Sequence, residues 1–126
     1  MAFFAAKERE YLAQVTSVYR GVLTDVHGQQ DDPLVSFSIR KTDDLWGAPD
    51  QPPERLTFEN GQCTNYLILL TEYPEGPGFA DGLPVRVFVT PQSRIDPELL
   101  YIVPEGSVAD GMMSRLQAIQ SAAPSH

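Results

Sequence analysis

The clearest pattern of hydrophobic and polar positions lies in residues Leu34–Arg40. Val35, Phe37 and Ile39 alternate there with polar residues. Because successive side chains of a strand point to opposite faces of a sheet, this alternation predicts a strand with one buried and one solvated face. The other apolar runs are short and separated by many of the 11 prolines and 9 glycines, which is typical of short strands joined by frequent turns.

Asn60-Gly61 predicts a β-hairpin. The pair lies between two β-rich segments, Leu56–Glu59 and Gln62–Leu70. Both turn residues tolerate a positive φ, as a type I′ turn requires. The resulting register places Cys63 opposite Phe58 and makes the second strand apolar on both sides. We therefore expect that second strand in the middle of the sheet.

The same patterns predict the remaining strands and loops. Strands are expected at Gln14–Arg20, with an extension past a bulge at Gly21, at Pro84–Val89 and at Leu99–Val103. Polar, proline-rich or glycine-rich segments predict loops at about 25–33, 43–53 and 73–83.

Two segments have helical character. Good helix formers at Ala5–Leu12 predict a short N-terminal helix. Near the C-terminus, Ser107–Asp110 resembles a capping box. An apolar stripe follows at helical spacing, formed by Val108, Met112, Leu116 and Ile119. We expect this stripe to pack on the sheet; the alternative is that it forms the face of a homodimer.

These elements predict a mainly β protein. Five or six short strands with long loops fit a small, partly open barrel, accompanied by a C-terminal helix and a short N-terminal helix. At 126 residues the chain is expected to be a single domain, 1–126. The barrel would occupy about 12–103 and the C-terminal helix about 107–121.

The charge balance narrows the classes of partner. The chain has 17 acidic and 9 basic residues, a formal net charge of -8. Such a surface repels phosphate backbones and anionic lipid headgroups, so we expect no nucleic-acid binding. No apolar run approaches the ~20 residues that span a bilayer, so no membrane span is expected. Nothing in the sequence indicates a cofactor.

The sequence does not determine the cellular compartment of the protein. Cys63 is the single cysteine and cannot form an internal disulfide, so cysteine usage does not indicate a redox environment. If Met1 is the natural start, we expect a cytoplasmic protein. If Met1 replaces a removed export signal, a periplasmic or surface location is favoured.

Four residues near the 25–33 loop have metal-ligating side chains. Asp25, His27, Asp31 and Asp32 combine carboxylates with an imidazole, a donor set that suits a divalent cation. Their spacing differs from that of an EF-hand, and we favour a solvated acidic loop. A catalytic Cys-His site would also need His27, but Cys63 is expected to be a small buried hydrophobe.

Trp46 is the main candidate for ligand binding. Asp43 and Asp44 precede it, and an aromatic ring among acids can bind a cationic partner or a sugar ring. Tyr73 is a second aromatic candidate. The alternative, which we favour, is that Trp46 folds back and closes one end of the barrel.

Three segments resemble bacterial domains similar to tissue inhibitors of metalloproteases. They are the helical lead into a strand at Ala6–Val18, the strand and turn at Phe37–Gly47, and Leu56–Phe58 followed by Cys63. This resemblance, over about half the chain, implies an OB-like barrel and an exported location. The family's Trp-Lys-Gly turn is shortened here to Trp-Gly. Metalloprotease inhibition is not implied, because the chain lacks the N-terminal cysteine with which the animal inhibitors bind zinc.

We therefore expect a non-enzymatic binding or interaction module that acts on a protein or another non-nucleic ligand. One alternative is a small metal-dependent hydrolase that uses His27 and nearby acids. Another is a structural subunit that oligomerises through the C-terminal helix. The sequence contains no phosphate-binding loop, dinucleotide fingerprint, zinc-ligand spacing or nucleophile elbow, which favours the binding module.

Overall fold

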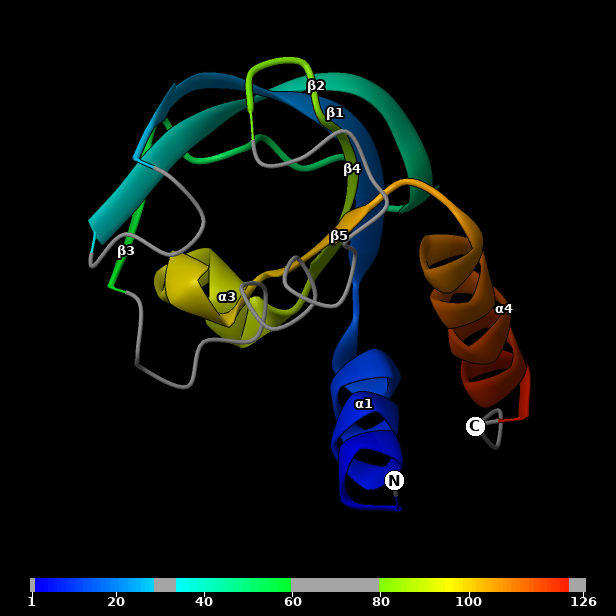
Figure 1. The fold of residues 1–126 in the computed structure, drawn as a ribbon. Coiled ribbons are helices and arrows are strands. Elements are labelled where there is room, and N and C mark those ends of the chain that lie inside the picture. Colours follow the sequence, from blue (N-terminus) through cyan, green and yellow to red (C-terminus); the bar gives the residue numbers. More distant parts are fainter. Residues whose placement is uncertain (1, 29–33, 60–79, 123–126) are drawn as a thin grey trace.

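A five-stranded antiparallel sheet, curled into a half-barrel, forms the body of the protein (Figure 1). The structure is a computed structural model that describes residues 2–28, 34–59 and 80–122. The strands lie in the order β3-β2-β1-β4-β5. In chain order the elements are α1 (Ala2–Gln14), β1 (Ser17–His27), β2 (Leu34–Gly47), β3 (Leu56–Glu59), β4 (Pro84–Val89), α3 (Pro91–Ile95), the 3-10 turn η1 (Pro97–Leu99), β5 (Tyr101–Pro104) and α4 (Ser107–Ala122). The predicted mainly β architecture with a helix at each end is confirmed.

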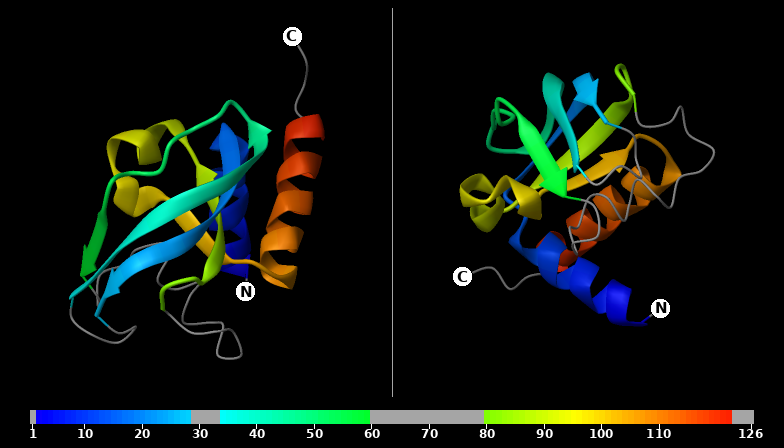
Figure 2. Two further views of the ribbon diagram at one scale, coloured as in Figure 1. Left: turned by 90° about the horizontal axis from the view of Figure 1, so that it is seen from above. Right: turned by 60° about the vertical axis from the view of Figure 1, so that its left-hand side comes forward.

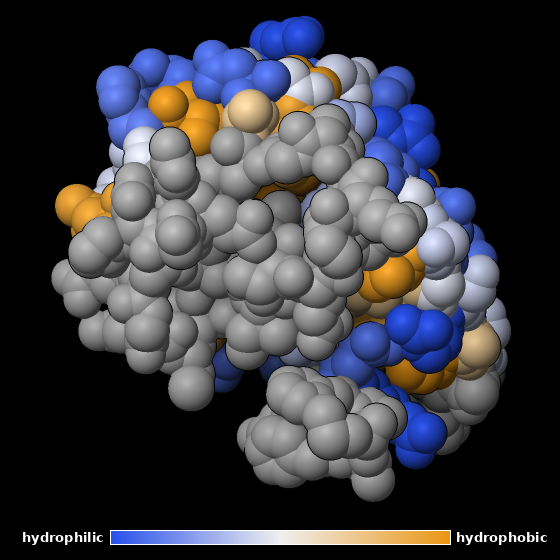
Figure 3. Space-filling view, viewed as in Figure 1, coloured by the Kyte–Doolittle hydropathy of each residue, from blue (hydrophilic) through white to orange (hydrophobic). Residues whose placement is uncertain are grey.

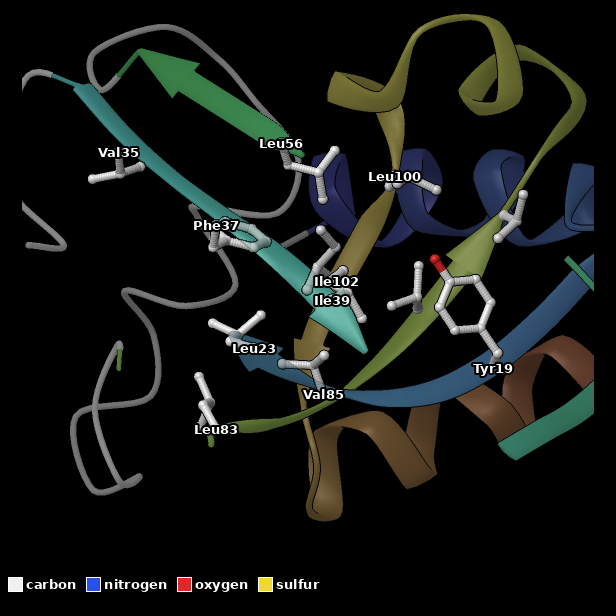
Figure 4. Packing of buried hydrophobic residues seen from close by; sticks show 12 residues of the cluster. Tyr19, Leu23, Val35, Phe37, Ile39, Leu56, Leu83, Val85, Leu100 and Ile102 are labelled. Atoms are coloured by element: carbon white, nitrogen blue, oxygen red, sulfur yellow. The ribbon is translucent and has the colours of Figure 1, made fainter. Parts of the chain in front are cut away.

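A hydrophobic core fills the concave side of the sheet (Figure 4). Val35, Phe37 and Ile39 of β2 are buried in it, as their alternation predicts. The other strands and the residues just before β4 and β5 complete this core with Tyr19, Leu23, Leu56, Leu83, Val85, Val87, Val89, Leu100 and Ile102. The short strands are therefore stabilised by one shared apolar interior.

A second hydrophobic cluster joins the convex side of the sheet to α1 and α4, which lie beside each other (Figure 2). The sheet, α1 and the link between α1 and β1 contribute Leu12, Val15, Val18, Phe88 and Val103, and α4 contributes Ala109, Met112 and Leu116. Strand β4 is consequently buried on both faces. Its alternation of valines with other residues does not mark a solvated face, because helices cover that side.

The pairing of β1 with β2 is interrupted by three register shifts. One lies between Arg20 and Gly21, which confirms the bulge predicted at Gly21. A Cβ atom at Gly21 would lie 2.7 Å from the carbonyl oxygen of Arg40. The two strands can therefore approach this closely only because residue 21 has no side chain. Bulges increase the local twist of a strand pair, which helps this sheet to curl.

Strand β2 extends further than the sequence predicts. The loop expected at 43–53 begins only after Gly47, because the end of β2 pairs with β1 as far as Ser17↔Gly47. The prediction of a loop over 43–47 was therefore wrong. Backbone pairing keeps this polar stretch extended although its side chains show no clean alternation. Strand β1 likewise runs to His27, into the predicted 25–33 loop.

Helix α3 has a short, well-capped structure that the sequence analysis did not predict. Its N-cap, Thr90, accepts a hydrogen bond from the backbone N–H of Ser93 (3.1 Å). The hydroxyl of Ser93 in turn accepts one from the N–H of Thr90 (2.8 Å), which completes a capping box. Pro91 occupies the first turn, where its missing N–H has no cost.

Helix α4 packs on the sheet of its own chain, which is the alternative that we favoured. Its fully buried face consists of Ala109, Met112 and Leu116, whereas Val108 is 40% exposed. The predicted stripe is thus displaced by one residue at its start. In the space-filling view, hydrophilic residues lie along the side of the molecule where α4 runs, with hydrophobic residues between them (Figure 3).

Polar contacts join α4 to the rest of the chain. Arg115 forms an ion pair with Glu8 of α1. The side-chain amide of Gln120 donates to the carbonyl oxygens of Leu12 (3.1 Å) and Val15 (3.2 Å). None of the helices that the structure describes is long and apolar enough to cross a membrane.

The predicted hairpin lies partly outside the described residues. Its first strand is confirmed as β3, which pairs with β2 from Leu34↔Glu59 to Phe37↔Leu56. The Asn60-Gly61 turn, Cys63 and the expected central strand lie outside the described ranges.

Candidate functional site

A cleft of about 520 Å³ lies between the 48–55 segment and α3. Four buried residues, Tyr19, Val89, Ser93 and Leu100, form its floor. More exposed residues form its rim: Pro49, Asp50, Gln51, Pro53, Arg94 and Pro97. The volume is in the range of small ligand sites, and the lining combines apolar walls with a few polar groups.

An ion pair between Asp50 and Arg94 joins the two sides of the cleft. Arg94 donates from Nη2 to Oδ2 of Asp50 (2.7 Å) and from Nε to Oδ1 (3.1 Å). The hydroxyl of Ser17 also donates to Oδ2. The backbone carbonyl of Asp50 accepts a hydrogen bond from Lys41 Nζ (2.8 Å). The segment that carries Asp50 is thereby tied to β1, β2 and α3 together.

These contacts change the pKa of Asp50. The guanidinium of Arg94 lowers the pKa of this carboxyl below its usual value, and partial burial opposes that effect. The hydrogen bond from Ser17 and the charge of Lys41 lower it further. Asp50 is therefore a charge-compensated carboxylate at neutral pH and is unsuited to act as a general acid.

Tyr19 is one of the buried residues in the floor of the cleft. The residue is only 1% exposed. Burial raises the pKa of Tyr19, and the nearby negative charge of Asp50 raises it further. Among the described residues, none forms a hydrogen bond with the Tyr19 hydroxyl.

The predicted ligand residues near Trp46 lie outside this cleft. Trp46 is half-buried and packs against the cluster beneath α1 and α4, so it covers the convex side of the sheet. Asp43 lies 3.8 Å from Arg20, and Asp44 accepts from Lys41 at 2.9 Å. Both acids thus have basic neighbours. Tyr73 lies outside the described residues.

The predicted metal ligands are only partly brought together. Asp25 Oδ1 lies 3.0 Å from Nε2 of His27. However, Arg55 donates to the Oδ2 atom of Asp25 (2.8 Å) and to its backbone carbonyl (2.8 Å), which leaves that carboxylate paired with a cation. Asp31 and Asp32 lie outside the described residues. Across residues 2–28, 34–59 and 80–122, no three His, Cys, Asp or Glu side chains gather as a metal site would require.

No pattern in the sequence predicts the cleft. Asp50 and Arg94 are 44 residues apart, and nothing in either segment alone shows that they pair. The visible signal was the density of prolines around 49–53, which indicates a stiff segment suited to hold one wall of a site. No family model, curated protein or solved structure matches the chain.

Proposed function

We propose that this protein is a non-enzymatic binding module that holds part of a protein partner in the cleft between residues 48–55 and α3. The observation that carries this proposal is the lining of the cleft, which combines apolar walls with one compensated ion pair, Asp50–Arg94. Such a lining favours binding, since specificity in pockets comes from a few placed polar groups among apolar surfaces.

The arrangement of the titratable groups argues against catalysis in this cleft. Nucleophilic and acid-base mechanisms need a base within hydrogen-bond reach of a nucleophile or of the substrate. None of the described residues that line the cleft is a histidine, and His27 is paired with Asp25 instead. Asp50, the carboxylate among the described lining residues, is held ionised by Arg94. These groups can orient a ligand, but they form no acid-base pair.

A photocrosslinking experiment tests the proposal. A photoreactive residue at Gln51, which is exposed on the rim, should crosslink a discrete protein in the source cells. The same residue at Gln117, which is exposed on α4, should not crosslink that protein. Identical products at both positions would contradict the proposal. So would a hydrolytic activity of the purified protein that His27→Ala abolishes.

A further inference from the structure

Ile95 is a large hydrophobic residue that lies almost entirely in contact with water. At 87% it is the most exposed of the large hydrophobic residues that the structure describes. It belongs to α3, which forms one wall of the cleft, and it lies in the chain between Arg94 and Pro97, which both line that cleft. A single exposed apolar residue is common on protein surfaces, but one on the wall of an apolar cleft enlarges the apolar surface that a partner can cover.

The accessible walls of the cleft are apolar as well. Pro49, Pro53 and Pro97 line it and are at least partly exposed, so a bound side chain can reach them. Their rings present hydrocarbon, and a proline has no backbone N–H to offer. Covering these rings together with Ile95 removes apolar surface from water, which favours an apolar side chain on the partner.

The arginines of the two walls are already paired with acids of this chain. Arg94 of α3 holds Asp50 across the cleft. Arg55, at the end of the 48–55 segment, donates to the carboxylate of Asp25 (2.8 Å). An anion on a partner would have to compete with these carboxylates for either guanidinium, so the cleft is poorly suited to an acidic partner.

Two exposed acids lie next to lining prolines. Glu54 follows Pro53, and Asp96 precedes Pro97. The chain as a whole carries a formal net charge of -8, which attracts cations and adds to the effect of these two carboxylates. Lysine or arginine on a partner therefore complements the charge on both walls of the cleft.

We infer that the partner segment held in this cleft carries an apolar side chain beside a basic one. The apolar side chain packs on the prolines and Ile95, and the cation lies beside Glu54 or Asp96. The aliphatic stem of lysine or arginine suits this arrangement, since it covers apolar surface while its charged end stays in water. This inference rests on the proposed function and specifies which chemistry of a partner the cleft recognises.

The test compares three peptides by NMR titration of the full chain. They are the N-acetyl methylamides of Leu-Lys-Leu, Leu-Gln-Leu and Leu-Glu-Leu, which share their apolar side chains and differ in the charge of the central residue. We expect the lysine peptide to shift the signals of Gln51 and Ile95 and to bind about two- to fivefold more tightly than the glutamine peptide. This preference should disappear at about 0.5 M salt, because exposed charges are then screened.

Two substitutions separate the apolar contribution from the charged one. Ile95→Ser should weaken the binding of every peptide about tenfold, whereas Val108→Ser, which changes an exposed apolar residue of α4, should not. Glu54→Gln should reduce the preference for the lysine peptide and leave the binding of the glutamine peptide unchanged. Its control is Glu10→Gln, which removes the same charge from an exposed position on α1 and should keep that preference.

Equal or tighter binding of the glutamine or glutamate peptide would overturn the inference, and so would unchanged binding by Ile95→Ser. Failure of all three peptides would overturn it as well. In each of these cases a Gln51-specific crosslink would leave the binding function standing. Failure of all three peptides together with absence of that crosslink would overturn both.

Discussion

Arg94 of α3 holds the carboxylate of Asp50, 44 residues earlier in the chain, through Nη2 and Oδ2 at 2.7 Å. This contact closes one side of the cleft and fixes the proline-rich segment against the sheet. We expect Asp50→Asn to lower the free energy of unfolding by about 1 kcal/mol at neutral pH, because the pair is partly exposed to solvent.

The same pair predicts a pH dependence. The folded protein lowers the pKa of Asp50 from its usual value of 3.8, chiefly through Arg94. Its contribution to stability is therefore complete above that value and is lost as the pH falls through the lower pKa of the folded state. Urea unfolding from about pH 7 to about pH 2 should show the natural protein and Asp50→Asn converging at the acid end. A constant difference across this range would contradict the assignment.

Two tyrosines allow a matched comparison of buried hydroxyls. Tyr11 OH lies 2.8 Å from the carbonyl oxygens of Phe88 and of Leu99, and it accepts from the N–H of Tyr101 at 3.1 Å. Tyr11→Phe should lower the free energy of unfolding by about 1–3 kcal/mol, since buried backbone groups lose their partner. Tyr19→Phe should leave it unchanged or raise it by up to about 1 kcal/mol. Chemical denaturation measures both, and an equal loss in the two variants would mean that Tyr19 has an acceptor.

A buried ion pair ties α4 to the sheet. Arg86, 5% exposed, donates from Nε to Glu105 Oε2 (3.0 Å), and its Nη2 lies 2.9 Å from Oδ1 of Asp110. Glu105→Gln should lower the free energy of unfolding by about 2–3 kcal/mol, because it leaves the guanidinium only partly paired. Asp43→Asn is the control. It removes an exposed partner 3.8 Å from Arg20 and should change stability by less than about 0.5 kcal/mol.

Replacement by alanine should lower the stability of the protein at one glycine, Gly21, and raise it at another, Gly111. At Gly21 a Cβ would meet the backbone oxygen of Arg40 at 2.7 Å, so Gly21→Ala should separate β1 from β2 and cost about 2 kcal/mol or more. In α4, a Cβ at Gly111 would meet only the flexible end of Arg115, at 3.2 Å. Gly111→Ala should therefore raise stability by about 1 kcal/mol through helix propensity. Thermal unfolding of the two variants distinguishes these outcomes.

Much of the fold was predictable because it depends on local patterns. The alternation at Val35, Phe37 and Ile39 identified one face of β2. Helix formers near the N-terminus identified α1, and an apolar stripe after a capping box identified α4. The errors occurred where pairing overrides side-chain pattern. Residues 43–47 have no alternation of their own, yet β1 supplies the hydrogen bonds that keep them in the sheet. Helix α3 has five residues, too few for a helical periodicity to be visible.

The sequence by itself determined the fold class, the acidic balance and the inward face of β2, because periodicity and charge belong to single segments. Only the tertiary structure decided where the cleft lies and which groups line it. Asp50, Arg94 and Tyr19 come from three separate segments, and their meeting depends on the curl of the sheet and on the placement of α3 over its concave core. Trp46 packs against the apolar cluster under α1 and α4 and does not line the cleft. This packing is favourable because it removes part of the apolar ring surface from water.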